Sequence, residues 1–186
     1  MRRIREAAEK RRASQNQFLL PEDPASFCEK VLEFKPTAYQ KKLLQDPAQF
    51  MAARWSRQSG KSFIVAAWLL YLCLRNAEFS ILVVAPSLRQ SKLIIRKVSN
   101  FLRYLPKLVA PKPLKTKVEF YNGSRIQAFP NNPETIRGEL AHFVYIDEFN
   151  YVADDDELYD AVIYTLGTTN GRFLTTSTPG TRDSML

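Results

Sequence analysis

The sequence predicts an α/β fold with a mainly parallel sheet and helices on both of its faces. Short apolar segments alternate with longer helical segments along the chain, which is the pattern of such a fold. Residues 80–85 contain a continuous apolar run, as expected of a strand that is covered on both faces. Residues 142–146 predict a second buried strand, and two acidic residues follow it directly.

The predicted elements begin after a basic, polar N-terminal extension at residues 1–35. Within it, residues 1–17 carry six basic residues and two acidic ones, which predicts an exposed helix or a mobile arm. Two prolines interrupt the chain before a short helix at 27–34. Asn122-Gly123 is a strong hairpin signal between two predicted strands. The second domain, residues 36–186, is expected to contain a helix at 39–44, strands at 50–55 and 80–85, helices at 63–74 and 86–104, strands at 117–121, 125–129 and 142–146, a helix at 154–166 and a strand at 172–177.

The composition is ordinary for a globular protein apart from a surplus of basic residues. Of 186 residues, 27 are Lys or Arg and 19 are Asp or Glu, which gives a formal net charge of +8. Such a surplus favours polyanionic partners, although it is equally consistent with a role in solubility alone. Cys28 and Cys73 fit neither a disulfide framework nor a zinc site. Without a signal peptide or a membrane-length apolar run, the expected setting is a reducing cytoplasm.

A Gly-Lys-Ser sequence marks the turn between a predicted strand and an apolar helix. Backbone N–H groups in such a turn point at a bound anion, and the helix dipole favours negative charge there. Gly60 lets the backbone approach a phosphate, Lys61 can reach the terminal phosphates, and Ser62 can place its hydroxyl on Mg²⁺. The general phosphate-loop motif has a glycine where Trp55 stands, so a plain strand-to-helix turn remains the alternative.

The two acidic residues after the second buried strand are Asp147 and Glu148. In phosphate-loop enzymes an acid at a strand end holds Mg²⁺ beside the Ser or Thr of the loop, and a second acid can deprotonate the attacking water. Asp147 is therefore the predicted metal ligand and Glu148 the predicted base. An apolar strand ending in two acids is common by itself, and the pair becomes specific only together with the loop upstream.

Two arginines are candidates for stabilising the charge that develops on a transferring phosphoryl group. Arg57 lies inside the phosphate loop, and Arg137 lies shortly before the acid-tipped strand. Most arginines have only a surface role. The position of Arg57 inside the phosphate loop argues against such a role, and the position of Arg137 argues against it more weakly. His142 is the single histidine and has no partner pattern, so we expect it to be structural.

Residues 86–117 contain nine basic residues and no acidic ones. This segment leaves the end of a central strand, where sites of open α/β sheets form. It could contact a nucleic-acid backbone without reading base sequence, and a solvated basic helix is an equal alternative. Four of these basic residues fall on the predicted helix: Arg89, Lys92, Arg96 and Lys97.

Taken in order, these residues resemble the large subunit of the terminase, the packaging ATPase of tailed bacteriophages and related viruses. That family commonly lacks the leading glycine of the phosphate loop and carries an arginine at the position of Arg57. Its acid-tipped strand resembles residues 144–148, and an upstream Arg-Gly pair resembles Arg137 and Gly138. The resemblance covers about residues 36–180.

The resemblance implies roles for further residues. Residues 36–40 resemble the adenine-contacting segment, with Gln40 as the reader of the base and Tyr39 as a stacking partner. The resemblance also suggests that Arg137 reaches the nucleotide of a neighbouring subunit. It leaves open whether Arg57 or Arg137 is the main arginine that stabilises the transition state. It assigns coupling of hydrolysis to movement to Thr176, Ser177 and Thr178. The ATP-binding loop would comprise Arg57, Gln58, Ser59, Gly60, Lys61 and Ser62.

For the whole protein, the resemblance implies a P-loop NTPase of the RecA/ASCE-like type. It would use Mg²⁺ and ATP to translocate double-stranded viral DNA into a procapsid, as a homo-oligomeric ring on the capsid portal. A small terminase subunit is the expected further partner and no membrane is involved. The expected location is the host cytoplasm, without stable incorporation into the virion. Since the family usually continues into a C-terminal nuclease domain, we expect the chain to be a fragment that lacks it.

Two other readings stay open. The first RecA-like domain of a superfamily 2 helicase shares the phosphate loop, the acid-tipped strand and a Ser/Thr-rich third motif. Such a helicase needs a second RecA-like domain, and its acid motif continues differently from Phe149-Asn150. The other alternative is a module that binds nucleotide or DNA and has little activity alone.

Overall fold

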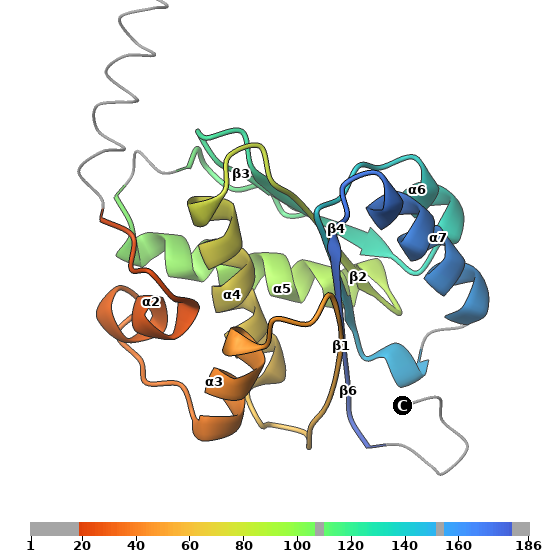
Figure 1. Ribbon diagram of the computed structural model, residues 1–186. Coiled ribbons are helices and arrows are strands. Elements are labelled where there is room, and N and C mark those ends of the chain that lie inside the picture. The colour runs from red at the N-terminus through yellow and green to blue at the C-terminus, as the bar shows by residue number, and fades with distance from the viewer. Residues whose placement is uncertain (1–18, 107–109, 152–154, 180–186) are drawn as a thin grey trace, which may run out of the picture.

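A computed structural model of the chain has three layers, with a sheet between two layers of helices (Figure 1). It describes residues 19–106, 110–151 and 155–179, and no helix in these ranges is long and apolar enough to cross a bilayer. The described elements are α2 (Pro24–Lys30), α3 (Ala38–Gln45), β1 (Phe50–Arg54), α4 (Lys61–Arg75), β2 (Ser80–Ala85), α5 (Leu88–Phe101), η1 (Leu102–Tyr104), β3 (Lys117–Glu119), β4 (Arg125–Pro130), α6 (Pro133–Arg137), β5 (Phe143–Asp147), η2 (Phe149–Tyr151), α7 (Asp155–Gly167) and β6 (Arg172–Ser177).

The strands of the described chain form one six-stranded sheet in the order β1-β6-β5-β2-β4-β3. All neighbouring strands are parallel except β3 and β4, which form the hairpin predicted from the sequence. β6 pairs with both β1 and β5, so Ser177 lies opposite Arg54 and Thr176 lies opposite Asp147. Because these three strands are parallel, their carboxyl ends meet at one edge, where ligand sites of open α/β sheets form.

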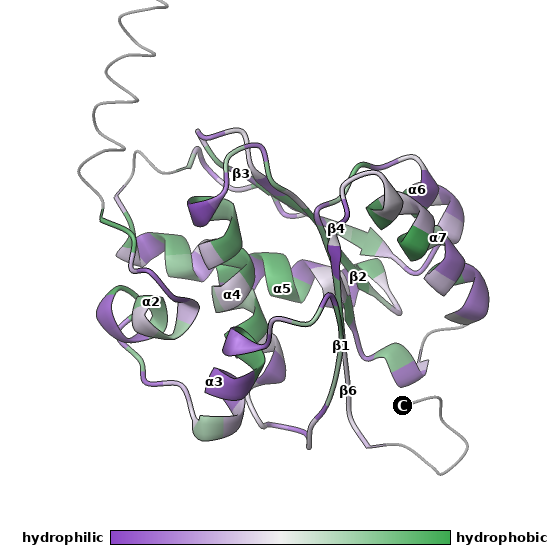
Figure 2. Cartoon of the chain, viewed as in Figure 1, coloured by the Kyte–Doolittle hydropathy of each residue, from purple (hydrophilic) through white to green (hydrophobic). Residues whose placement is uncertain are grey.

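Each face of the sheet packs against its own layer of helices, which confirms the predicted α/β fold. Helices α2 to α5 cover one face, and α6 and α7 cover the other (Figure 1). Phe143 and Tyr145 of β5 belong to the core on the α4 side, whereas Val144 and Ile146 belong to the core on the α7 side. Hydrophobic residues run along much of α4, while α3 is largely hydrophilic (Figure 2). Side chains alternate along a strand, so Asp147 follows Tyr145 toward the α4 side.

Several element boundaries differ from the sequence-based expectation for local reasons. The helix predicted at 27–34 instead runs from Pro24 to Lys30, because Asp23 caps it and proline is favourable at the first helical position. The helix predicted at 86–104 is α-helical only to Phe101 and ends in the tighter turn η1. The short helix α6, which the periodicity of the sequence does not predict, starts at an Asn132 cap followed by proline.

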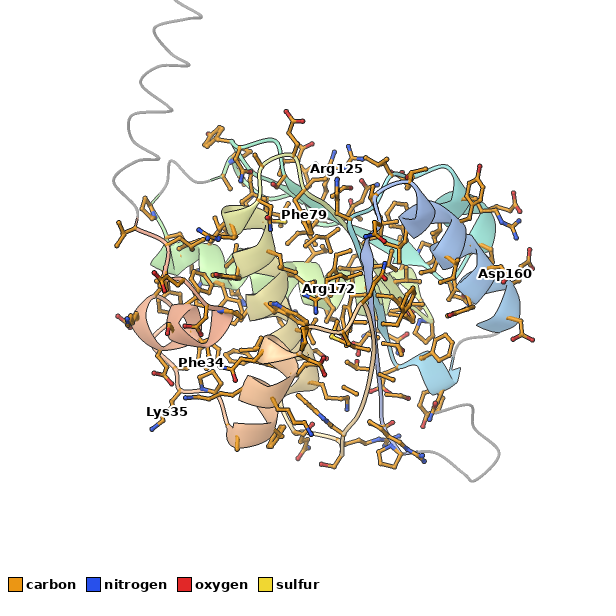
Figure 3. All side chains as sticks on the ribbon, in the orientation of Figure 1. Phe34, Lys35, Phe79, Arg125, Asp160 and Arg172 are labelled. Carbon is orange, nitrogen blue, oxygen red and sulfur yellow. The ribbon has the colours of Figure 1, made fainter. Side chains whose placement is uncertain are left out.

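The described part of the N-terminal extension packs on the same core as the rest of the chain. Phe27 lies 5.6 Å from the ring of Tyr71 on α4. Phe34, which is labelled in Figure 3, packs against Phe63 and Phe101, with ring centroids 4.8 and 6.1 Å away. This aromatic cluster ties residues 27–34 to α4 and α5. The basic residues expected in an exposed arm fall within 1–18, which lie outside the described residues.

Candidate active site

The turn between β1 and α4 has the backbone of an anion-binding loop. Gln58 and Gly60 adopt left-handed conformations, with φ values of 58° and 80°. Gly60 is the N-cap of α4 and has no side chain with which to cap it, which leaves the first N–H groups of the helix to a ligand. A Cβ added to Gly60 would lie 2.9 Å from Nε2 of Gln40. The left-handed backbone therefore favours glycine here, and a larger residue would also have to displace the Gln40 amide.

Lys61 is buried in this turn, with its ammonium group against backbone oxygens. The Nζ donates to the carbonyls of Trp55 and Ser56 at 3.3 and 3.2 Å, and the residue is only 6% exposed. The Oε1 of Glu148 lies 3.7 Å from the same Nζ. A buried ammonium group needs such partners, and phosphate oxygens can take the place of the carbonyls.

Ser62 and Asp147 meet at the carboxyl edge of the sheet. The Oγ of Ser62 donates to Oδ2 of Asp147 at 3.3 Å. One residue comes from the first turn of α4 and the other from the last position of β5. A hydroxyl and a carboxylate oxygen are both hard donors of the kind that Mg²⁺ prefers, and Mg²⁺ is usually bound by few protein groups plus substrate phosphates. No cluster of three His, Cys, Asp or Glu side chains that could hold a metal occurs among the described residues.

Two buried hydroxyl groups hold the other oxygen of Asp147. Its Oδ1 accepts from the phenol of Tyr145 at 2.8 Å and from the hydroxyl of Thr176 at 2.9 Å. Burial, and then the negative charge of Asp147, raise the pKa of Tyr145 well above its ordinary value. The phenol therefore stays protonated and keeps donating. These bonds fix the carboxylate so that Oδ2 faces Ser62.

Glu148 is held between the phosphate loop and the end of β6. Its Oε2 accepts from both the backbone N–H and the hydroxyl of Thr178, each at 3.1 Å, while its Oε1 faces Lys61. Its backbone has a φ of 55°. A left-handed conformation costs a non-glycine residue about 1–2 kcal/mol, and such strain is found where a functional group must be held in place.

The three residues at the end of β6 each contact a different part of this site. Thr176 binds Asp147, and Thr178 binds Glu148. Between them, the carbonyl of Ser177 accepts from the N–H of Trp55 at 3.1 Å, where the phosphate loop begins. All three residues are buried. The segment predicted to couple hydrolysis to movement therefore contacts both acidic residues and the loop.

Tyr39 and Gln40 lie against the outer side of the phosphate loop. Both side chains donate to the carbonyl of Ser59, from the Tyr39 hydroxyl at 2.9 Å and from Gln40 Nε2 at 3.3 Å. The Tyr39 ring meets Trp55 edge-on at 4.8 Å, and the Gln40 Oε1 accepts from the N–H of Thr37. The structure thus brings the predicted base-contacting residues next to the phosphate loop.

The two candidate arginines lie in different layers. Arg57 is exposed within the phosphate loop. Arg137 is at the end of α6, where its guanidinium pairs with Glu134 at 2.6 Å and with Glu157 of α7 at 3.3 Å. α6 and α7 cover the face of the sheet opposite to α4 (Figure 1). Arg57 therefore lies in the same loop as Lys61, whereas Arg137 lies on the other face of the sheet and contacts Glu134 and Glu157.

The basic residues of α5 divide into two groups. Arg89 and Arg96 are exposed and Lys92 is half-buried, and all three line one groove on the helix. Lys97 is half-buried and does not line that groove. His142 is structural, as predicted: its Nδ1 accepts from the N–H of Ser80 at 3.1 Å and its ring stacks on Phe79.

Sequence reasoning missed two residues that belong to this site. Tyr145 lies two positions before Asp147, so strand alternation alone would have put both side chains on one face. Asn150 donates from its backbone to the Ser177 hydroxyl at 3.3 Å and from its side chain to the Thr178 carbonyl at 3.1 Å. No local pattern signals Asn150, because its partners come from a strand that follows much later in the chain.

Comparisons with known proteins agree with this geometry. The sequence profile of the family described as "Terminase large subunit, T4likevirus-type, N-terminal" matches residues 53–182. The fold is similar to that of the large terminase ATPase domain of Thermus phage P74-26, with a TM-score of 0.72 and 21% identity over 86% of this chain and 71% of that one.

Two further solved structures share the fold at lower similarity. A large terminase from a thermophilic bacteriophage, in complex with ADP, matches with a TM-score of 0.62 and 10% identity, over 76% of this chain and 39% of that one. Dbp5 of S. cerevisiae, bound to RNA and ADP BeF3, matches with a TM-score of 0.57 and 16% identity, over 87% of this chain and 45% of that one.

The fold alone does not separate a large terminase from an RNA-bound protein such as Dbp5, because both occur among these structures. The family profile does separate them, and it covers more than two thirds of the chain. The protein therefore belongs to the T4likevirus-type family of terminase large-subunit N-terminal domains.

Proposed function

We propose that this domain hydrolyses ATP with Mg²⁺ and that hydrolysis drives double-stranded viral DNA into a procapsid. One observation carries the proposal: Lys61 and Ser62 of the phosphate loop meet Glu148 and Asp147 at one edge of the sheet, at 3.7 and 3.3 Å. Membership of the terminase family supports a motor ATPase role in packaging. The ADP complex of the similar phage terminase supports nucleotide binding.

The triphosphate would be held by the phosphate loop. The N–H groups at the start of α4 point to it, and Lys61 exchanges the carbonyls of Trp55 and Ser56 for phosphate oxygens. The hydroxyl of Ser59 is buried and has no hydrogen-bond partner among the described residues, so it is available to the phosphates as well. Tyr39 and Gln40, fixed beside Ser59, would contact the adenine.

Ser62 and Asp147 would hold Mg²⁺, since their oxygens face each other and are of the right chemical type. A bound Mg²⁺ neutralises charge that develops on the β- and γ-phosphate oxygens. The chain's own contribution is the orientation of Asp147 by Tyr145 and Thr176. Such partners of a ligand commonly set both metal affinity and activity.

Glu148 would accept the proton of the attacking water. The water oxygen forms a bond to the γ-phosphorus, the bond from that phosphorus to the bridging oxygen breaks, and a water proton passes to the carboxylate. When Lys61 turns to the phosphates, the Glu148 Oε1 that faces it becomes free for the water, while Thr178 keeps Oε2 in place. Arg57 in cis, or Arg137 from a neighbouring subunit, would stabilise the transition-state charge.

The wider setting is part of the same proposal. The domain would act as a homo-oligomeric ring on the capsid portal, together with a small terminase subunit, in the host cytoplasm. An arginine supplied by a neighbour makes such a ring a condition for full activity. Basic residues of α5 would contribute to contacts with DNA.

Replacing Glu148 by Gln tests the proposal directly. The variant should bind ATP as the wild type does but release no phosphate, because the amide cannot accept the proton. Glu119→Gln, the same change at an exposed site on β3, serves as the matched control and should keep full activity. If the Glu148→Gln variant released phosphate at the wild-type rate, Glu148 would not be the base. Nucleotide and DNA binding without any hydrolysis by the wild type, even when it is assembled, would favour the binding-module alternative.

A further inference from the structure

A single turn after β5 brings the chain back onto the end of β6. Glu148 starts this turn with its left-handed backbone, and Phe149 anchors it by packing against the core on the α7 side. Asn150 is the residue of η2 that reaches β6. Its backbone N–H donates to the Ser177 hydroxyl at 3.3 Å, and its side chain donates to the Thr178 carbonyl at 3.1 Å. The proposed base and Asn150 therefore belong to one turn.

This turn holds Thr178 through both its N–H and its carbonyl. The N–H and the hydroxyl of Thr178 donate to Oε2 of Glu148, each at 3.1 Å, while the carbonyl accepts from Nδ2 of Asn150. In extended backbone the N–H and the carbonyl of one residue point to the same side, and the following Pro179 favours that conformation. Loss of the bond from Asn150 would therefore loosen the bonds from Thr178 to Glu148 as well.

The contact with the Thr178 carbonyl needs the donor end of the Asn150 amide. Turning the amide over would set its Oδ1 against the carbonyl, so that two acceptors would face each other. Oδ1 itself is buried and has no hydrogen-bond partner among the described residues. An unpaired buried acceptor lowers stability, so the single bond of this side chain adds little net stability. The position that Asn150 gives Thr178 therefore explains the residue better than a contribution to folding does.

We propose that Asn150 is a positioning residue for ATP hydrolysis. Through the Thr178 carbonyl it keeps the N–H and the hydroxyl of Thr178 on Glu148, and so holds the carboxylate where it takes the proton of the attacking water. The inference rests on the proposed function, because it takes Glu148 as the base. Since Asn150 contacts the end of β6 rather than the phosphate loop, its loss should lower kcat and leave the KM for ATP unchanged.

Asn150→Asp tests the donor, because a carboxylate keeps the volume of the amide but cannot donate to Thr178. Phosphate release by the full 186-residue chain should show a kcat lower by about tenfold, and Asn150→Ala should show a similar loss. The matched control is Asn76→Asp. The side chain of Asn76 is also half-buried, and its Nδ2 donates to the carbonyl of Leu72 at 2.9 Å, at the far end of α4. This control should keep wild-type kinetics.

Two further measurements separate positioning from general damage to the site. Asn150→Ala and Thr178→Val both act through Glu148, so the double variant should lose much less kcat than the product of the two single losses. Hydrogen exchange of the Thr178 amide, followed by NMR in the nucleotide-free chain, does not depend on turnover. That exchange should be faster by about tenfold in Asn150→Ala, as expected of a local opening, and unchanged in Asn76→Asp.

Several results would overturn the role of Asn150. Wild-type kcat in both Asn150 variants would do so, as would unchanged exchange of the Thr178 amide. A loss in Asn150→Ala without one in Asn150→Asp would mean that volume matters rather than the donor. Glu148→Gln, measured alongside, reports on the proposed function separately. Wild-type release by Glu148→Gln would end both proposals, whereas an inactive Glu148→Gln with unaffected Asn150 variants would end only this one.

Discussion

The Oγ of Ser62 donates to the Oδ2 of Asp147 across 3.3 Å, although 85 positions separate the two residues in the chain. The contact exists because β1, which leads into the phosphate loop, and β5, which ends in Asp147, run parallel on either side of β6. The other oxygen of Asp147 is already held by Tyr145 and Thr176. The orientation of this carboxylate can therefore be changed without removing its charge.

Tyr145→Phe should raise the Mg²⁺ concentration that activity requires while leaving the fold intact. The change deletes one of the two hydroxyl groups on Oδ1 of Asp147 and keeps the buried ring. Loss of a group that orients a metal ligand typically lowers metal affinity or activity by about 10- to 100-fold. The measurement is the Mg²⁺ concentration that gives half-maximal phosphate release. Tyr164→Phe, at a tyrosine of α7 that is 73% exposed, is the matched control. An unchanged Mg²⁺ requirement in Tyr145→Phe would mean that Thr176 alone orients Asp147.

Thr178→Val should lower kcat and leave the KM for ATP nearly unchanged, because Thr178 contacts the proposed base rather than the nucleotide. The substitution removes the hydroxyl bond to Glu148 and keeps the backbone N–H bond. A hydrogen bond to a charged group contributes about 1.5–3 kcal/mol, so a loss of about tenfold is expected at the lower end of that range. Thr178→Ser keeps the hydroxyl and should retain most of the activity. A rise in KM with an unchanged kcat would place Thr178 on the nucleotide instead.

Gly60→Ala should lower both stability and ATP affinity. The left-handed backbone at Gly60 costs an alanine about 1–2 kcal/mol. The new methyl group would also displace the Gln40 amide, which lies 2.9 Å away. The control is Gly167→Ala at the end of α7, where nothing lies within 4 Å of the added atom and the backbone is not left-handed. Chemical denaturation and ATP titration should show a loss only for Gly60→Ala. Equal effects of the two changes would contradict this account of the loop.

Much of the fold could be predicted because its signals are local. The continuous apolar runs identified β2 and β5, which are fully buried strands, and the Asn122-Gly123 turn identified the β3–β4 hairpin. The phosphate loop could be located from the Gly-Lys-Ser sequence and its position between a strand and a helix. The convergence of Lys61 with Glu148 could also be predicted, since both follow strands of one parallel sheet.

What the sequence did not reveal depends on contacts between distant segments. The end of β6 could be assigned to coupling only through the family resemblance, and its hydrogen bonds to Asp147 and Glu148 require the strand order. The left-handed backbone of Glu148 has no sequence signal, because glycine or asparagine would normally mark it. The ion pairs of Arg137 depend on the packing of α6 against α7, and α6 has no periodicity of its own because it is too short.

Asp23→Asn should make stability less sensitive to acid. The Ser26 hydroxyl, together with the N–H groups of Ser26 and Ala25, holds the pKa of Asp23 below its ordinary value. A carboxylate with a lowered pKa in the folded state stabilises the protein above the unfolded pKa of about 3.9, and this stabilisation is lost as the pH falls through the folded value. Asparagine still caps the helix but does not titrate, whereas Asp23→Ala should cost about 1 kcal/mol at neutral pH. The free energy of unfolding, measured by urea denaturation from neutral pH to below pH 4, should fall more steeply for the wild type. If the free energy of unfolding fell equally with pH in the wild type and in Asp23→Asn, Asp23 would not contribute to acid unfolding.

Arg137→Ala should leave nucleotide binding by a single subunit unchanged and reduce phosphate release only in the assembled motor. Within one subunit the guanidinium pairs with Glu134 and Glu157, and exposed ion pairs of this kind contribute little to stability. It lies on α6, on the opposite face of the sheet from α4 (Figure 1), and the family resemblance is what suggests that it serves a neighbour. Mixing Arg137→Ala and Glu148→Gln subunits should then restore activity, because an intact Glu148 from one meets an intact Arg137 from the other. In a randomly mixed head-to-tail ring, about a quarter of the sites would be complete. Arg57→Ala mixed with Glu148→Gln should recover nothing if Arg57, which lies in the same loop as Lys61, serves its own subunit as proposed. Recovery with Arg57→Ala and none with Arg137→Ala would reverse the two assignments.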